Sequence, residues 1–190
     1  TSNGQAHSSS DTVTNASDFS GWGDAVDAGT ITLEPGLWSL SNFGQVLVAT
    51  IANGKTFTWN AGDAARLSVR ASTTTTDFQT TNNPTATRTT LISPTTRHLI
   101  HFGTETTIGS TATQDDMFIR FSSQENINDY TPTAENTAGT QRLAAGSRII
   151  GAKLGRNAIY VWSDTSLFTM RFVGQPFTFA FEQVGTNCGL

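Results

Sequence analysis

Apolar and polar residues alternate along several short segments of this chain, and alternation with a period of two predicts β-strands. The first group of such segments begins at residue 37 and comprises LWSLS, QVLVATI, KTFTWN and ARLSVRAS. Asn53-Gly54 lies between the second and third segments, and this dipeptide favours a hairpin turn because both residues tolerate a positive φ. The pattern predicts an antiparallel meander of about four strands over residues 37–72.

Two more groups of alternating segments follow along the chain. The second lies within about residues 89–140 and comprises TTLIS, RHLIHFG and DMFIRFS, joined by long polar connections. The third lies within residues 148–184 and comprises RIIGAKL, AIYVWSD, SLFTMRFV and FTFAFEQV. Its turns contain GRN, DT and GQP, which are residues that turns favour. The third group predicts a second complete four-stranded meander.

Equivalent positions recur in the three groups at a spacing of roughly 55 residues, which indicates a diverged repeat. The recurring positions are Leu47-Val48, Leu99-Ile100 and Ile159-Tyr160 in the second segment of each group, and Phe57, Phe118 and Phe168 in the third. Repeated antiparallel sheets of four strands favour the blades of a β-propeller over a plain β-sandwich. Propellers use about four to eight blades, so about three blades predict part of a larger ring and a piece of a longer polypeptide.

The first 30 residues differ from the rest, because they are rich in Ser, Asn, Gly and Asp and lack a periodic apolar pattern. We expect residues 1–30 to form an extended polar arm and residues 31–190 to form the partial propeller. Only 14% of the 190 residues are charged and the net charge is −4, which argues against a protein that binds nucleic-acid phosphates.

The single cysteine, Cys188, excludes an internal disulfide. No apolar stretch is long enough for a membrane span, and the N-terminus lacks the apolar core of a signal peptide. These features favour a soluble protein that is made inside the cell.

Three longer segments are distinctive: WSLSNFGQVLVATIANGKTFTW (38–59), RFSSQENINDYTPTAENTAGTQRL (120–143) and AIYVWSDTSLFTMRFVGQPFTFAFEQVGTNCGL (158–190). These three segments resemble tail proteins of tailed bacteriophages. In the second segment Tyr130 stands where Trp is common in the family. The resemblance spans about residues 37–190 and is greatest to the nozzle or hub propellers of short-tailed phages.

The resemblance implies a structural virion protein, assembled in the host cytoplasm, that forms a ring around the DNA ejection channel. Its partners would be copies of itself and neighbouring tail proteins, and double-stranded DNA would pass through without specific binding. The weak negative charge is compatible with such a conduit. The family supplies no catalytic, cofactor or metal residues, so we expect a protein that is not an enzyme.

Two other functions compete with this one. A carbohydrate- or receptor-binding tail module would use exposed aromatic residues, with Trp59 and Trp162 as candidates. A propeller glycosidase of the sialidase type is less favoured, because IANGKTFTW has the Gly, Thr and Trp of the Asp-box but lacks its Ser and Asp. Such a site also needs clustered arginines, whereas here they are scattered at positions 66, 70, 88, 97, 120, 142, 148, 156 and 171.

The remaining candidate residues favour structural roles. His98 and His101 form H-x-x-H, but residues three apart on a strand point to opposite faces and cannot share a metal ion. Cys188 has no basic or His neighbour in sequence, so we expect a small buried thiol. Five acids could supply oxygens to Ca²⁺, but they form no ordered calcium loop and are expected to be solvated: Asp115, Asp116, Glu125, Asp129 and Glu135.

Seven aromatic residues lie in or beside the predicted strands, and we expect them to fill the core between the blades. They are Trp38, Trp59, Phe118, Tyr160, Trp162, Phe168 and Phe172.

Overall fold

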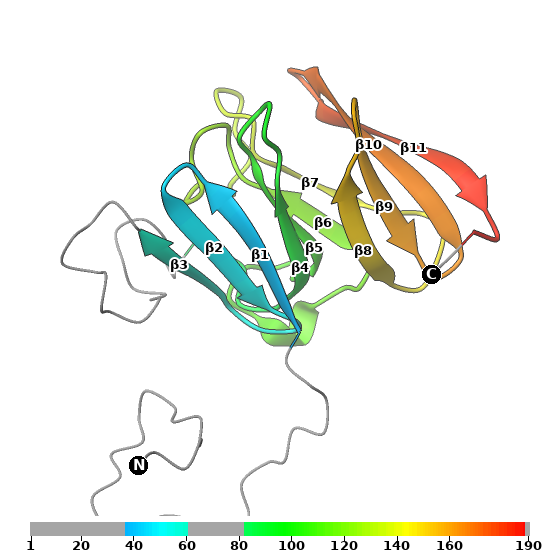
Figure 1. Cartoon of the computed structure of the whole chain (residues 1–190), viewed down its shortest axis with the longest axis horizontal. Coiled ribbons are helices and arrows are strands. Elements are labelled where there is room, and N and C mark those ends of the chain that lie inside the picture. Colours follow the sequence, from blue (N-terminus) through cyan, green and yellow to red (C-terminus); the bar gives the residue numbers. More distant parts are fainter. Residues whose placement is uncertain (1–36, 61–81, 189–190) are drawn as a thin grey trace, which may run out of the picture. The chain divides into compact units, whose positions relative to one another are not determined.

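A computed structural model describes residues 37–60 and 82–188 (Figure 1). The arm predicted for residues 1–30 and the strand predicted at residues 65–72 lie outside the described residues. The described ranges contain eleven β-strands, one short 3-10 helix (η3, Thr111–Thr113) and no α-helix. The all-β prediction is therefore confirmed.

The first sheet has three strands, β1 (Trp38–Phe43), β2 (Val46–Ile51) and β3 (Thr56–Asn60), paired antiparallel in chain order. The predicted turn between β2 and β3 is present. Asn53 takes a positive φ of 59°, and the Gly54 N–H donates to the Ile51 carbonyl at 3.0 Å. Position 53 therefore requires a residue that tolerates the left-handed region, as Asn does.

The second sheet contains β4 (Thr87–Ile92), β5 (Leu99–Thr104), β6 (Phe118–Phe121) and β7 (Gly139–Arg142), again in chain order. The apolar pattern does not predict β7, and its first two residues, Gly139 and Thr140, lie in the polar connection that was expected to end the second group. Its sequence, GTQR, is largely exposed and so lacks apolar alternation. The strand forms through its backbone pairing with β6, from Phe118 opposite Arg142 to Phe121 opposite Gly139.

The third sheet contains β8 (Ile149–Leu154), β9 (Ile159–Ser163), β10 (Ser166–Gly174) and β11 (Thr178–Thr186), antiparallel and also in chain order. All four strands agree with the segments expected from the apolar pattern. Together the three sheets are successive antiparallel meanders of three or four strands.

The second sheet lies between the other two (Figure 1), and all six residues of β5 are buried. On one side, Val48 of β2 packs with Ile92, Leu99 and Tyr130. On the other side, a larger apolar cluster joins the second sheet to the third. Its members include Ile100, Phe102, Ile119, Phe121, Ile159, Val161, Phe168, Met170 and Phe179. Successive residues of β5 therefore serve two different cores, which explains its nearly continuous burial.

The sheets also contact one another through their first strands. β1 lies next to β4, and β4 lies next to β8. The three described sheets do not form a closed ring. Consecutive meanders are thus stacked face to face, with their first strands at the common side.

The prediction that seven aromatic residues fill the core was wrong for most of them, since only Phe168 is buried. Trp38 is 53% exposed, Phe172 is 45% exposed and Tyr160 is 37% exposed. Trp59, Phe118 and Trp162 are half-buried. In β9 the reason is that Ile159 and Val161 face the second sheet, so that Tyr160 and Trp162 point to the opposite face.

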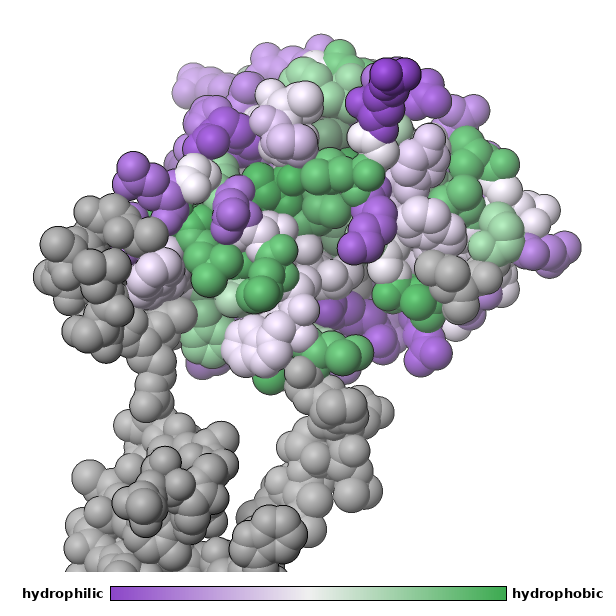
Figure 2. Space-filling view, in the orientation of Figure 1, coloured by the Kyte–Doolittle hydropathy of each residue, from purple (hydrophilic) through white to green (hydrophobic). Residues whose placement is uncertain are grey.

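The molecular surface is mixed in character. Figure 2 shows several apolar patches on one face, interrupted by hydrophilic residues. Leu37, Trp38 and Leu40 remain largely exposed at β1, and Val173 and Phe177 remain largely exposed around the turn between β10 and β11. Large exposed apolar side chains are common at sites of protein contact.

Candidate functional site

A buried imidazole lies on the side of the second sheet that faces the first. The His101 side chain is fully buried, with Nδ1 at 3.1 Å from Thr87 Oγ1 and Nε2 at 2.9 Å from Tyr130 Oη. Thr87 Oγ1 also lies 3.0 Å from Thr104 Oγ1. Burial, and secondarily the charge of Arg120, lower the pKa of His101 to about 3, while burial raises the pKa of Tyr130. The imidazole is therefore neutral and joins β4 and β5 to the loop before β7.

Glu105 and Arg120 are buried charges near this imidazole, and both bind backbone groups. The Glu105 carboxylate accepts hydrogen bonds from the Thr85 N–H at 3.0 Å and the Gly109 N–H at 2.7 Å, and from the Thr85 hydroxyl. Arg120 Nη2 donates to the carbonyls of Glu105 and Thr106 at 3.3 and 2.9 Å. These contacts hold the start of the β5–β6 connection against the sheet.

His98 lies on the other side of the second sheet. Its Nε2 is 3.0 Å from Thr137 Oγ1, and its ring packs edge-on against Phe179 of the third sheet at 5.1 Å between centroids. Burial lowers its pKa to about 4. His98 and His101 thus contact different layers. This agrees with the prediction that residues three apart on a strand point to opposite faces, and the two imidazoles are not directed at a common point.

The five candidate calcium ligands are separated from one another. Asp115, Asp116 and Glu125 form ion pairs with three different arginines, Arg142, Arg88 and Arg97, at 2.6, 2.7 and 2.6 Å. Asp129 Oδ2 accepts a hydrogen bond from Asn136 Nδ2 at 2.9 Å, and Glu135 is exposed. Within residues 37–60 and 82–188, no group of three or more His, Cys, Asp or Glu side chains is arranged to hold a metal ion.

Asp115 shows how such a surface acid is stabilised. Burial raises the pKa of its carboxyl, but the Met117 N–H and the Arg142 guanidinium outweigh this effect, so that the pKa is lowered. The Asp115 side chain therefore joins the β6 start to Arg142 at the end of β7.

The prediction of a buried thiol at Cys188 was wrong, because this cysteine is free and exposed. It follows the end of β11, where its N–H donates to the Thr165 carbonyl at 3.3 Å. Trp59 and Trp162, the candidates for carbohydrate contact, lie on different sheets. Trp162 lies beside Tyr160, with 6.1 Å between ring centroids.

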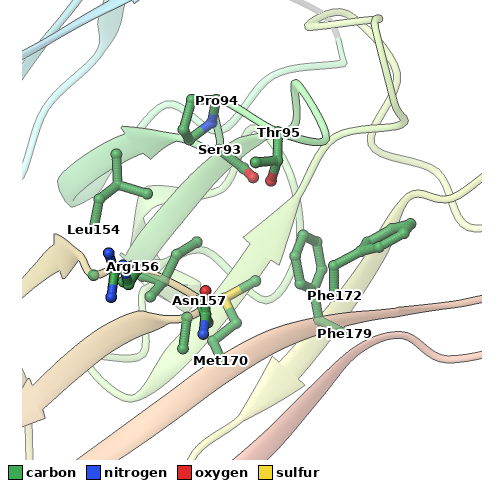
Figure 3. Close-up of a pocket in the computed structure, with 12 residues that line it drawn as sticks. Ser93, Pro94, Thr95, Leu154, Arg156, Asn157, Met170, Phe172 and Phe179 are labelled. Carbon is green, nitrogen blue, oxygen red and sulfur yellow. The ribbon is translucent and has the colours of Figure 1, made fainter.

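A cavity of about 310 Å³ lies between the second and third sheets (Figure 3). The turn after β4 supplies Ser93 and Thr95 to one wall, and the β8–β9 turn supplies Arg156 and Asn157 to another. Phe172 and Phe179, from β10 and β11, close one end. The sequence pattern does not predict this cavity, because its walls are turns about 60 residues apart that only the stacking of sheets brings together.

A second cavity of about 340 Å³ lies where β1, β4 and β8 meet. Trp38, Ile149 and Ile150 form its apolar part, and Arg88 and Arg148 lie at its border. Arg88 also forms the ion pair with Asp116, so its charge is already neutralised.

No protein-family model matches the chain, and neither the curated proteins nor the solved structures include a significant match. Among the described residues, no helix has the length and apolar character needed to cross a membrane.

Proposed function

We propose that this chain is a β-propeller segment of a bacteriophage tail protein and that its role is structural. The single observation that carries the scaffold role is the stacking of consecutive antiparallel meanders, with β1, β4 and β8 adjacent. In a propeller, successive blades pack face to face in this way, and their first strands surround the central channel.

The buried polar groups support a scaffold over a catalytic role. His101 uses both ring nitrogens within the fold, and Glu105 and Arg120 bind backbone groups. Polar groups that form hydrogen bonds within the fold hold loops in place instead of facing a substrate. The arginines at 88, 97 and 142 each pair with a different acid, so they do not form the cluster that a sialidase-type glycosidase needs.

The tail assignment rests on the three segments that resemble phage tail proteins. The first contains β1, β2 and all of β3 except Asn60, and the third contains β9–β11. The second contains Tyr130, which is fully buried against His101, and Asn136, which donates to Asp129 Oδ2 and to the Thr131 carbonyl at 2.9 and 2.7 Å. The residues that carry the resemblance therefore build sheets and a hydrogen-bonded loop, as expected for a shared scaffold.

The proposed ring would contain further copies of the chain or further blades. One face of the third sheet points away from the second sheet and carries Tyr160, Trp162 and Leu167. Leu167 is opposite Trp162 in the β9–β10 pairing. This partly apolar face suits contact with another sheet. Double-stranded DNA would pass along the axis, and the weak negative charge of the chain would limit its retention.

Immunogold labelling tests the proposal directly. Antibodies raised against the purified chain should label the tail axis of virus particles from cells that produce this protein, whereas antibodies against a capsid protein should label the head. Peptides from residues 37–190 should also be found by mass spectrometry of the purified particles. Absence of the protein from purified particles, or labelling of the head alone, would refute the tail assignment.

A further inference from the structure

The cavity between the β4–β5 turn and the β8–β9 turn has the features of a binding site. Its volume, about 310 Å³, lies at the lower end of the range for ligand pockets, which is about 300–1,000 Å³. Ile159, Met170 and Phe179 provide a buried apolar floor. Polar side chains from two sheets border it. The site is therefore large enough for about one ring-sized unit of a ligand.

The polar border carries a cation that the fold does not use. Arg156 is exposed, and in the described part of the chain it forms no ion pair. It lies beside Asn157, an exposed amide, in the β8–β9 turn. The arginines at 88, 97 and 142, by contrast, are each paired with an acid. Arg156 is thus available to bind a carboxylate on a ligand in a bidentate manner.

The opposite wall provides hydroxyl groups. Ser93 Oγ accepts a hydrogen bond from Thr96 Oγ1 at 2.7 Å, which leaves its own proton free to be donated. Thr95 is exposed at the same turn. Figure 3 shows the Ser93 and Thr95 side chains on the cavity wall across from Arg156 and Asn157. Hydroxyl and amide groups on facing walls match the alternating donors and acceptors of a sugar ring.

An aromatic surface completes the site. Phe172 is 45% exposed, and its ring packs edge-on against Phe179 at 5.7 Å between centroids. The His98 ring lies against both, at 5.9 and 5.1 Å. Three mutually packed rings form a stiff wall, which loses little conformational entropy when a ligand binds. The apolar face of a sugar ring can cover such an aromatic surface.

From these features we infer that this cavity binds one acidic sugar unit, with the carboxylate on Arg156, hydroxyls on Asn157, Ser93 and Thr95, and the apolar ring face on Phe172. A single unpaired arginine is too little for a nucleic-acid backbone, which requires clustered cations. The site adds a binding function to the proposed scaffold, and it does not depend on ring formation.

Ligand-observed NMR with the full chain tests this inference. Methyl β-D-glucuronide and methyl β-D-glucoside have the same ring and differ in the carboxylate. We expect saturation transfer to the glucuronide, with weaker transfer to the glucoside. In the protein spectrum, chemical-shift changes should be confined to Ser93–Thr95, Leu154–Ala158 and the surroundings of Phe172.

Variants at two exposed arginines identify the contact. Arg156→Gln should weaken glucuronide binding about tenfold, because a charged hydrogen-bonding partner is lost. Arg171→Gln is the matched control, because Arg171 is exposed on β10 and does not line the cavity. The affinity of this variant for the glucuronide should be unchanged. Phe172→Ser should weaken glucuronide binding as well, because the aromatic surface under the sugar ring is lost.

Several outcomes would overturn the inference. Equal binding of glucoside and glucuronide would remove the acidic specificity, and equal loss in both arginine variants would indicate non-specific attraction of anions. Competition by acetate at the same concentration as the glucuronide would show that the sugar ring contributes nothing. Absence of saturation transfer with both sugars would show that the cavity is not a sugar site. None of these results bears on whether the protein is part of a virus tail.

Discussion

The two interfaces of the middle sheet are built from different chemistry. Toward the first sheet, a small apolar cluster around Val48 lies beside a network of hydroxyl groups. Thr90 Oγ1 lies 2.9 Å from Thr50 Oγ1 and 3.2 Å from Ser39 Oγ, and Thr50 Oγ1 lies 2.8 Å from Thr56 Oγ1. Toward the third sheet, the contact is almost wholly apolar, and Phe121 packs edge-on against Phe179 at 4.9 Å.

This difference suggests separate roles for the two interfaces, one in the stability of the fold and the other in the alignment of the sheets. Apolar burial supplies a large free energy but tolerates small shifts of one sheet over another. Hydrogen bonds between hydroxyls contribute less each but require particular distances, so they favour one register. We therefore expect the interface with the third sheet to dominate the free energy of unfolding, and the interface with the first sheet to fix how the sheets align.

The largest effect should come from the apolar interface. Phe121→Ala removes a side chain that is 3% exposed, and it should lower the free energy of unfolding by about 3–5 kcal/mol. Urea denaturation followed by tryptophan fluorescence measures this loss. Phe177→Ala is the control, because Phe177 is 77% exposed and its removal should change stability by less than about 0.5 kcal/mol. Similar losses for the two variants would contradict the division between interfaces.

Acid should weaken both interfaces through their buried histidines. The folded-state pKa values, about 3 for His101 and about 4 for His98, lie below the ordinary value of 6.5. The unfolded chain therefore binds more protons below pH 6.5, and stability falls as the pH falls from 6.5 through the folded-state values. For His101 the loss between pH 7.5 and pH 5 should be about 2 kcal/mol, and His98 should add to it.

Urea denaturation at pH 7.5, 6 and 5 measures this loss, and NMR titration of the imidazole protons assigns it. The His101 resonances should not titrate above pH 5 while the protein is folded. A folded-state midpoint near 6.5 for either buried histidine would contradict the burial that the structure shows.

Much of the fold follows from sequence, but the environment of each strand face does not. Alternation and turn residues predict the strands of the first and third sheets, and Asn53-Gly54 predicts its turn. The strand at Gly139–Arg142 was missed because its pairing is carried by backbone groups, which leave no pattern in the side chains. Glu105, within a segment that appeared only polar in sequence, is fully buried because backbone N–H groups satisfy its charge.

The candidate site was even less predictable. Ser93 and Arg156 belong to turns of different sheets, and no local pattern links them. In the same way, Tyr160 and Phe168 are both aromatic residues in strands, yet one is exposed and the other is buried. Which face is covered depends on the position of the neighbouring sheet, and this is a property of the tertiary structure.

A medium effect is expected at Tyr130. Tyr130→Phe keeps the ring in the core but leaves His101 Nε2 without its partner at 2.9 Å, so stability should fall by about 1–2 kcal/mol. The chemical shifts of the His101 ring should move as well, and those of His98 should not. Loss of stability with no change at His101 would indicate that the hydroxyl acts elsewhere.

The smallest effect should come from the hydroxyl network itself. Thr90→Val preserves the branched shape while removing the hydroxyl contacts to Thr50 and Ser39. Stability should fall by about 1 kcal/mol or less, because Thr50 still has Thr56 as a partner and the residue-90 N–H still donates to Ser39 Oγ at 3.1 Å. Thr90→Ser keeps the hydroxyl and serves as the control. If the network fixes register, Thr90→Val should broaden backbone resonances in β1, β2 and β4 more than Thr90→Ser does, even where their stabilities are similar. Unbroadened β1 and β2 resonances in the valine variant would mean that apolar packing alone aligns the first two sheets.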